Sequence, residues 1–230
     1  MITYLFPFFS AFFISISIMP CIIRISHRYG YVAAPKEDRW HKKPTALLGG
    51  VGIYISFIIP ALIFVPLNAL TVGVLLCATA MFSLGLYDDL REVKPYTKLI
   101  FQIIVTIMVI MVGVKVKIIP LIYIAIPLTV FWIVGITNAL NILDNMDGLS
   151  SGIAFVASIC ILIYSIQNNL HLVTLFSSIL SGTTLGFLIF NFNPAKIFMG
   201  DCGSLFLGFL LSIVTILGTW QEATNLLLVL

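Results

Sequence analysis

Two adjacent carboxylates, Asp88 and Asp89, end an apolar run in the stretch LYDDLREVKPYTK. Three basic residues, Arg91, Lys94 and Lys98, follow them closely. An aspartate pair in this position can hold a divalent cation or accept a proton. It can equally be a solvated helix end that is neutralised by its own basic residues. This stretch alone leaves both interpretations open.

A second stretch, NALNILDNMDG, repeats oxygen-bearing side chains at every third position: Asn138, Asn141, Asp144 and Asp147. Residues three apart are neighbours on a helix, so the spacing predicts one inward-facing stripe of such side chains. Carboxylate oxygens suit magnesium, which usually takes only one or two protein ligands beside substrate phosphates. A structural polar stripe between helices is the alternative, and the apolar surroundings make it the weaker interpretation.

A third stretch, NFNPAKIFMGDCGSLFLG, places Asp201 between Gly200 and Gly203 just before an apolar run. The hydroxyl of Ser204 and the amides of a helix N-terminus could bind an anion there. A turn-capping or helix-capping role is the alternative for this aspartate, because aspartate is favoured before helices.

An earlier stretch, APKEDRWHKKPTALLGGVG, is basic. Its cluster of Arg39, His41, Lys42 and Lys43 is followed by Thr45 and by a pair of glycines. Fixed cations suit a pyrophosphate, and glycine lets a backbone approach a phosphate closely. Taken alone, the stretch is better explained as a basic anchor at the membrane surface.

The composition indicates what kind of structure must hold these stretches. The chain has 230 residues, of which 60% are hydrophobic and 9% are charged, and its mean hydropathy is +1.15. Soluble domains carry about 25% charged residues, so the sequence predicts an all-α, polytopic helical bundle within membrane lipids. The net charge of +3 is too small to indicate nucleic-acid binding.

About nine apolar segments are candidates for membrane spans. The first is interpreted as a retained span, because it lacks the basic start and the cleavage site of a signal peptide. The predicted segments are 3–23, 48–66, 69–87, 99–114, 118–137, 150–167, 171–190, 204–219 and a last one that starts near residue 224.

Alternating these segments across the membrane places ten of the twelve basic residues and eight of the nine acidic residues on one side. Cytoplasmic loops are enriched in lysine and arginine, so we expect a multi-pass protein of the plasma membrane with its N-terminus outside. The four polar stretches then face the cytoplasm together. Metal-assisted displacement at phosphorus fits such a site, because that chemistry consists mainly of positioning and charge neutralisation.

In order and spacing, the four stretches resemble the polyprenyl-phosphate N-acetylhexosamine-1-phosphate transferases. The similarity runs from about Pro35 to Gly208 and rests on DRWHKKPTALLGG, DDLREVKPYTK, NALNILDNMDGL and NPAKIFMGDCGSLFLG. It implies that a polyprenyl phosphate attacks the sugar-side phosphorus of a UDP-N-acetylhexosamine and releases UMP. Mg²⁺ is the implied cofactor, with Mn²⁺ as a substitute, and a homodimer is compatible with the resemblance.

The resemblance also implies roles for individual residues. The implied catalytic residues are Asp88, Asp89, Asp144 and Asp147, the implied metal ligands are Asn141 and Asp201, and the implied substrate-binding residues are Arg39, His41, Lys42, Lys43, Thr45, Lys98 and Asn138. The aspartate pair would position, and in one mechanism deprotonate, the lipid phosphate. The other two catalytic aspartates would hold the nucleotide and support the metal. The basic stretch is closer to the N-acetylglucosamine-1-phosphate branch than to the phospho-muramoyl-pentapeptide branch.

Members of that family generally have further spans and a later cytoplasmic loop that is rich in histidine and arginine. None of His27, His41 and His171 matches that loop, so we expect a single transferase domain over 1–230 that lacks it. Two alternatives stay open: a non-catalytic lipid-phosphate-binding membrane protein and an intramembrane prenyltransferase. The prenyltransferase would be expected to carry paired aspartate-rich motifs, and Asp-Asp occurs only once in the sequence.

Overall fold

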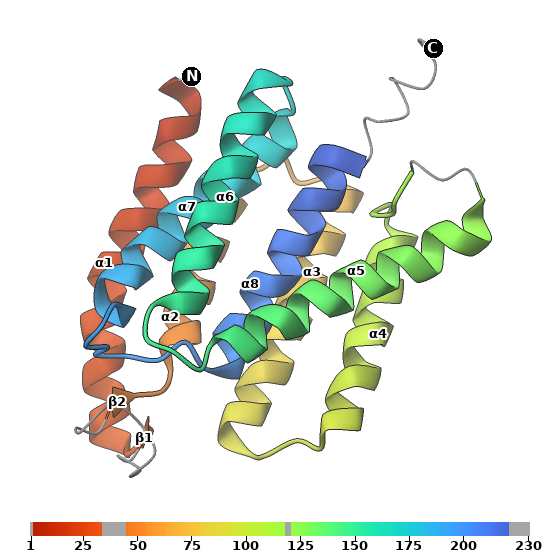
Figure 1. The fold of residues 1–230 in the computed structure, drawn as a ribbon. Helices are drawn as coiled ribbons and strands as arrows, with labels where there is room; N and C mark the ends of the chain where they lie inside the picture. The colour runs from red at the N-terminus through yellow and green to blue at the C-terminus, as the bar shows by residue number, and fades with distance from the viewer. Residues whose placement is uncertain (1, 34–44, 118–120, 221–230) are drawn as a thin grey trace.

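The computed structural model describes residues 2–33, 45–117 and 121–220. Over these residues the chain is almost entirely helical (Figure 1). The helices are α1 (Ile2–Tyr29), α2 (Gly49–Phe64), α3 (Ala69–Leu90), α4 (Pro95–Met111), α5 (Ile122–Leu143), α6 (Leu149–Gln167), α7 (His171–Asn191) and α8 (Gly200–Thr215), followed by the π-helical turn η1 (Ile216–Trp220). The prediction of an all-α bundle is confirmed.

Six of the helices, α1, α3, α5, α6, α7 and α8, are long and apolar enough to cross a membrane. Two more, α2 and α4, are apolar but have only 16 and 17 residues. These eight helices occupy eight of the predicted apolar segments, whereas the segment starting near residue 224 lies outside the described residues. A bundle of six candidate spans and two shorter apolar helices is therefore shown, and the number nine is not confirmed.

Several helices extend beyond the predicted apolar segments, which corrects the predicted loops. Asp88 and Asn141 lie in the last turns of α3 and α5, Lys98 lies in the first turn of α4, and Asp201 lies in the first turn of α8. These polar side chains pair with one another inside the bundle, so the helices can continue through them.

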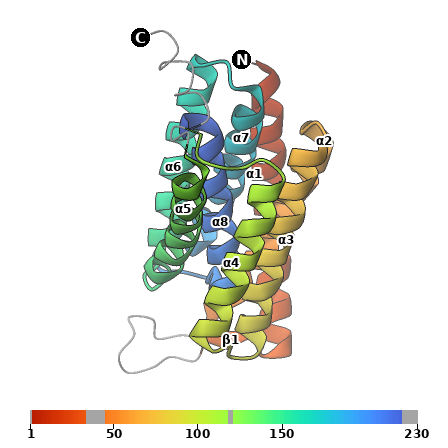
Figure 2. The same cartoon turned by 90° about the vertical axis from the view of Figure 1, so that its right-hand side faces the viewer.

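The central helix of the bundle is α8, whose residues are almost all buried. It packs against α3 and α5, while α7 packs against α1 and α6 (Figures 1 and 2). The polar end of the bundle, at the bottom of Figure 1, holds the ends of α3 and α5 and the starts of α4 and α8. The N-terminus of α1 lies at the opposite end.

Glycines allow the helices to approach closely near the start of α8. A Cβ atom on Gly50 of α2 would lie 2.2 Å from the backbone nitrogen of Gly203. A Cβ atom on Gly85 of α3 would lie 2.4 Å from the backbone oxygen of Asp201. Small residues permit such backbone contacts between helices packed in lipid. They bring the polar ends of α3 and α8 into direct contact.

A short two-stranded sheet closes the polar end beside α1. Its strands, β1 (Val32–Ala33) and β2 (Thr45–Ala46), are antiparallel, with Ala33 opposite Thr45. Ala46 also forms a parallel bridge to Ile197, just before α8. The segment that follows α1 is thereby tied to the segment that leads into α8.

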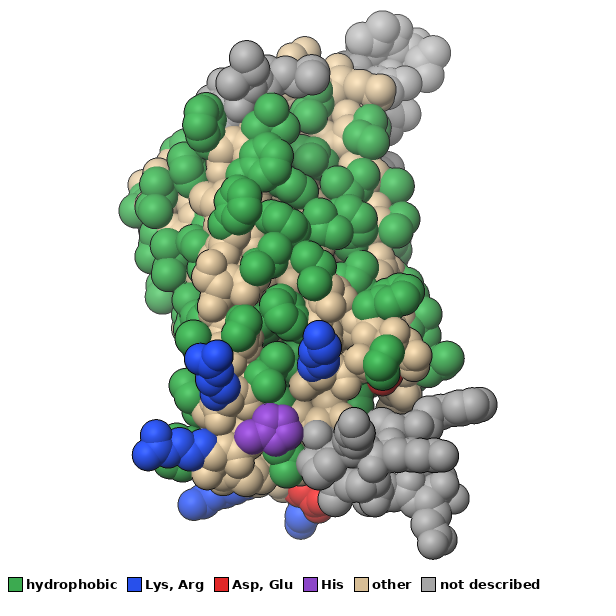
Figure 3. All heavy atoms as spheres, turned by 90° about the vertical axis from the view of Figure 1, so that its left-hand side faces the viewer, with side chains coloured by type: hydrophobic (Ala, Val, Ile, Leu, Met, Phe, Trp, Pro, Cys, Tyr) green, Lys and Arg blue, Asp and Glu red, His purple; other side chains and the backbone are tan. Residues whose placement is uncertain are grey.

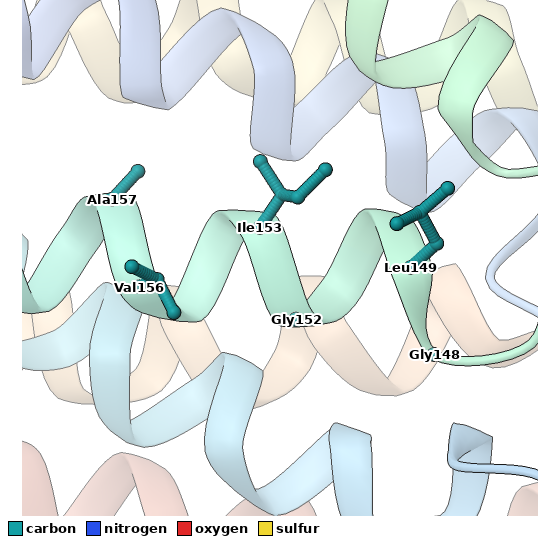
Figure 4. Close-up of a pocket in the computed structure, with 6 residues that line it drawn as sticks. All are labelled: Gly148, Leu149, Gly152, Ile153, Val156 and Ala157. Carbon is teal, nitrogen blue, oxygen red and sulfur yellow. The ribbon is translucent and has the colours of Figure 1, made fainter.

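The outer surface is largely apolar, as a membrane environment requires. Figure 3 shows hydrophobic side chains over most of one face, with lysine, arginine and histidine side chains at its lower end. An apolar groove with a volume of about 460 Å³ also runs along α6 (Figure 4). The residues that line this groove are Gly148, Leu149, Gly152, Ile153, Val156 and Ala157.

Candidate active site

The six carboxylates among the described residues all lie at the polar end of the bundle. They are Asp88, Asp89, Glu92, Asp144, Asp147 and Asp201. Six of the eight described lysine and arginine residues lie at the same end, whereas Lys115 and Lys117 follow α4 at the other end. The predicted gathering of the polar stretches is therefore seen for the part of the chain that the structure describes.

Lys98 links two of these carboxylates across three helices. Its ammonium nitrogen lies 2.9 Å from Asp88 Oδ2 and 2.5 Å from Asp201 Oδ2. The side chains of Lys98 and Asp88 are only 13% and 11% exposed, and that of Asp201 is 33% exposed. Charges this deep must be paired to be tolerated. Lys98 therefore fixes the ends of α3 and α8 relative to α4.

Asn141 contacts the other oxygen of the Asp201 carboxylate. Its Nδ2 donates to Asp201 Oδ1 at 2.6 Å and to Ser204 Oγ at 2.8 Å. The Oδ1 oxygen of Asn141 accepts no hydrogen bond from the described residues. The two predicted metal ligands are thus adjacent, although they come from α5 and α8.

Asp88 and Asp89 diverge although they are adjacent in sequence. Asp88 also accepts a hydrogen bond from the backbone nitrogen of Val93 at 2.7 Å, which closes the turn after α3. Asp89 instead accepts hydrogen bonds from the backbone nitrogens of Asp201 at 2.8 Å and Cys202 at 3.0 Å. Of these two adjacent aspartates, only Asp88 contacts Lys98.

Asp144 departs from the predicted helical stripe. It is the residue that caps the C-terminus of α5, and Asn141 is the last of the four to lie within that helix. After Asp144 the chain turns towards Gly148, whose φ of +71° is left-handed and which precedes α6. Burial, and then the negative charges of Asp201 and Asp89, raise the pKa of the Asp144 carboxyl to about 8. Near neutral pH the Asp144 carboxyl is therefore largely protonated.

Asp147 lies beyond the end of α5 and holds a different segment. Its Oδ2 accepts hydrogen bonds from Asn193 Nδ2 at 3.2 Å and from the backbone nitrogen of Ala195 at 3.0 Å. These contacts position the loop between α7 and α8. The hydrogen bonds described for Asp147 do not reach Asp88, Lys98 or Asp201.

Two buried amides that support the site were missed from the sequence. Gln102 of α4 and Asn138 of α5 exchange amide hydrogen bonds of 2.6 and 3.3 Å, one helical turn further from the polar end than Lys98 and Asn141. Asn191 accepts a hydrogen bond from Ser151 Oγ at 2.7 Å and donates one to the Ile197 oxygen at 2.9 Å. Gln102 could have been identified from the sequence, because it is the one glutamine within the apolar run of α4.

The structure describes only part of the basic stretch. Arg39, His41, Lys42 and Lys43 lie outside the described residues. Thr45 lies in β2 and is 4% exposed. Its predicted contact with substrate stays a prediction.

The donor set fits magnesium. Lys98 contacts the carboxylates of Asp88 and Asp201, while Asp89 contacts the backbone of α8 and Asp144 lies close enough to both Asp89 and Asp201 to be affected by their charge. No group of three or more histidine, cysteine or acidic side chains forms a ready metal site among the described residues. Magnesium, however, is usually held by one or two carboxylates together with substrate phosphates. Asp201, with the free Asn141 oxygen beside it, meets that requirement.

A comparison with known protein families finds a match for most of this helical bundle. Residues 71–219, which run from the first turn of α3 through α8 and include every acidic residue discussed above, match the model of glycosyl transferase family 4. The chain belongs to this family. The resemblance found from the sequence is thereby confirmed.

Family 4 relatives align with most of the chain. The chain is 36% identical over 221 residues to a probable undecaprenyl-phosphate N-acetylglucosaminyl 1-phosphate transferase of Bacillus subtilis. This alignment covers 90% of the chain and 61% of the relative. The chain is 32% identical over 212 residues to a decaprenyl-phosphate N-acetylglucosaminephosphotransferase of Mycolicibacterium smegmatis. This alignment covers 80% of the chain and 52% of the relative. A phospho-N-acetylmuramoyl-pentapeptide-transferase of Bacillus thuringiensis is 32% identical over 237 residues, an alignment that covers 90% of the chain and 72% of that relative. The chain thus spans about half to three fifths of the length of the first two family 4 relatives.

Proposed function

We propose that this family 4 chain transfers N-acetylhexosamine 1-phosphate, specifically N-acetylglucosamine 1-phosphate, from a UDP-sugar to a polyprenyl phosphate, and that it serves the synthesis of a cell-wall or surface polysaccharide. The observation that carries the proposal is the convergence of Asp88, Lys98, Asn141 and Asp201, from four helices, at one end of an apolar bundle. That position suits an acceptor whose chain lies in lipid and whose phosphate lies at the surface. The names of the relatives support the reaction class.

In the proposed reaction, an oxygen of the acceptor phosphate attacks the sugar-bearing phosphorus of the UDP-sugar. A new phosphorus–oxygen bond forms, the bond to the bridging oxygen breaks, and UMP leaves with that electron pair. The second pKa of a phosphate monoester is about 6, so the acceptor is largely dianionic near neutral pH. The protein then needs to orient the phosphates and neutralise their charge more than it needs to remove a proton.

The described residues divide this work. Lys98 would contact the phosphate oxygens, and Asp88 would hold Lys98 in place through its 2.9 Å ion pair. Asn141 and Asp201 would hold Mg²⁺, or Mn²⁺ in its place, which when bound offsets the charge that develops on the transferring phosphate. Both Asp201 oxygens already have partners, so the metal must replace one of these contacts.

The nucleotide side of the proposed site is assigned from the motif. Asp144 and Asp147 flank the turn after α5 and would hold the nucleotide, and Asn138, one turn earlier in the helix than Asn141, would contribute to substrate binding. The basic residues Arg39 to Lys43 and Thr45 would contact the pyrophosphate. Their similarity to the N-acetylglucosamine branch, and the name of the Bacillus subtilis relative, favour that sugar.

We propose that the polar end faces the cytoplasm of a plasma-membrane protein, because lysine and arginine are enriched there. Single cysteines at Glu92 and Lys196 should react with an impermeant maleimide only after cells are opened, in a chain without its native cysteines. A cysteine at Lys117, which follows α4 at the other end, should react in intact cells. Labelling of the first two from outside would contradict the orientation.

The donor can be identified by assaying UMP release. We expect the purified chain, reconstituted with polyprenyl phosphate and Mg²⁺, to release UMP from UDP-N-acetylglucosamine faster than from UDP-N-acetylmuramoyl-pentapeptide. A preference for the pentapeptide donor would overturn the sugar assignment. Binding of lipid phosphate without UMP release from any UDP-sugar would instead support the non-catalytic alternative.

A further inference from the structure

The start of α8 lacks a cap of its own. Met199 occupies the N-cap position and makes no side-chain hydrogen bond to the first turn. The backbone is left-handed at Gly200, the first residue of α8, with a φ of +71°. The first amides of a helix have no partner within the helix and are usually capped by a side-chain oxygen. The first turn of α8 therefore needs an acceptor from elsewhere.

Asp89 of α3 supplies that acceptor. Its Oδ1 accepts from the backbone nitrogen of Asp201 at 2.8 Å, and its Oδ2 accepts from that of Cys202 at 3.0 Å. These are the second and third residues of α8, the positions at which an N-cap side chain normally bonds. The negative carboxylate also interacts favourably with the positive end of the helix dipole.

The surrounding backbone is shaped for this contact. Gly85 lies one turn before Asp89 on α3, and a Cβ atom there would lie 2.5 Å from the backbone nitrogen of Cys202. A Cβ atom on Gly200 would lie 2.8 Å from Asp89 Oδ2. Side chains at either glycine would push the carboxylate and the first turn of α8 apart.

We propose that Asp89 is a positioning residue that caps α8 from α3 and thereby fixes Asp201. Both of its oxygens are committed to backbone amides of the turn that carries Asp201. The adjacent Asp88 makes the contact with Lys98. The two aspartates thus have separate tasks, one on the backbone of α8 and one on the lysine. The inference rests on the proposed function only where Asp201 is taken as a metal ligand.

Hydrogen exchange tests the cap without relying on activity. In Asp89→Ala, the amides of Asp201 and Cys202 should exchange roughly 2- to 30-fold faster, the range expected when a helix cap is lost. Asp89→Asn, which keeps one acceptor oxygen, should show a smaller increase and serves if the alanine variant does not fold. Asp88→Ala is the matched control: it loses the contact with Lys98 but keeps both hydrogen bonds from Asp89, so exchange at the start of α8 should rise clearly less than in Asp89→Ala.

Mn²⁺ affinity, measured by electron paramagnetic resonance, supplies the second readout. Residues that orient a metal ligand typically contribute about 10- to 100-fold to metal affinity, and we expect a loss of that size in Asp89→Ala. Exchange within α7 should stay unchanged as a control for the fold. Unchanged exchange at Asp201 and Cys202 in both Asp89 variants would overturn the capping role, whatever the chain transfers. Faster exchange with unchanged Mn²⁺ affinity would overturn the link to Asp201.

Discussion

Replacement of Asp201 by asparagine is expected to lower the rate of sugar-phosphate transfer by about 100-fold or more, the usual effect of removing a group that stabilises charge in a transition state. The carboxylate contacts both Lys98 and Asn141, so its negative charge balances the lysine as well as the proposed cation. Asparagine has nearly the same shape, and the chain should still insert and purify normally. UMP release at saturating Mg²⁺ measures the effect.

Glu92→Gln is the matched control for this substitution. Glu92 lies at the same end of the bundle and is exposed, so its change removes one negative charge without touching the cluster. We expect transfer close to that of the unmodified chain. Full activity in Asp201→Asn, or an equal loss in both variants, would contradict the assignment of Asp201.

Replacement of Lys98 by methionine should have the second largest effect. It removes the ammonium group that lies within 2.9 Å of both Asp88 and Asp201. Two partly buried carboxylates then face each other without a cation, which we expect to lower the free energy of unfolding by about 1–3 kcal/mol. Transfer should fall by about 100-fold, with a higher KM for the polyprenyl phosphate because the acceptor loses a cationic contact.

Lys94→Met separates this effect from a general loss of positive charge. Lys94 is exposed just before α4, where its ammonium lies 5.9 Å from the centre of the Tyr96 ring. We expect both the thermal unfolding midpoint and the transfer rate to change little. A loss of transfer as large as that of Lys98→Met would indicate a surface effect of charge and not a site contact.

The helical architecture could be predicted because it follows from composition and from the length of apolar runs. The helix ends were less predictable, since the predicted boundaries assumed that a span stops at the first polar residue. Lys98 and Asn141 show why this fails: each pairs inside the bundle, so the helix continues through it. The predicted helical stripe of polar side chains is found for Asn138 and Asn141. It ends at Asp144, where the chain leaves the helix.

The candidate residues could be named from the sequence, but their partners could not. Asp88 and Asp89 form one motif in the sequence, yet successive residues of a helix point about 100° apart, and only the packing of α8 shows what each one meets. The pairing of Gln102 with Asn138 was missed for the same reason, because it joins two helices. Tertiary contacts, and not motifs, separate a capping aspartate from one that holds a lysine.

Whether Lys98 and Asp201 serve one transferase site is tested most directly by combining Lys98→Met with Asp201→Asn in the transfer assay. Groups that act together are strongly non-additive, whereas independent sites add in free energy. We therefore predict a double variant whose transfer rate lies within about threefold of the slower single variant. A rate reduced by the product of the two single losses would contradict a single shared site at the polar end of the bundle.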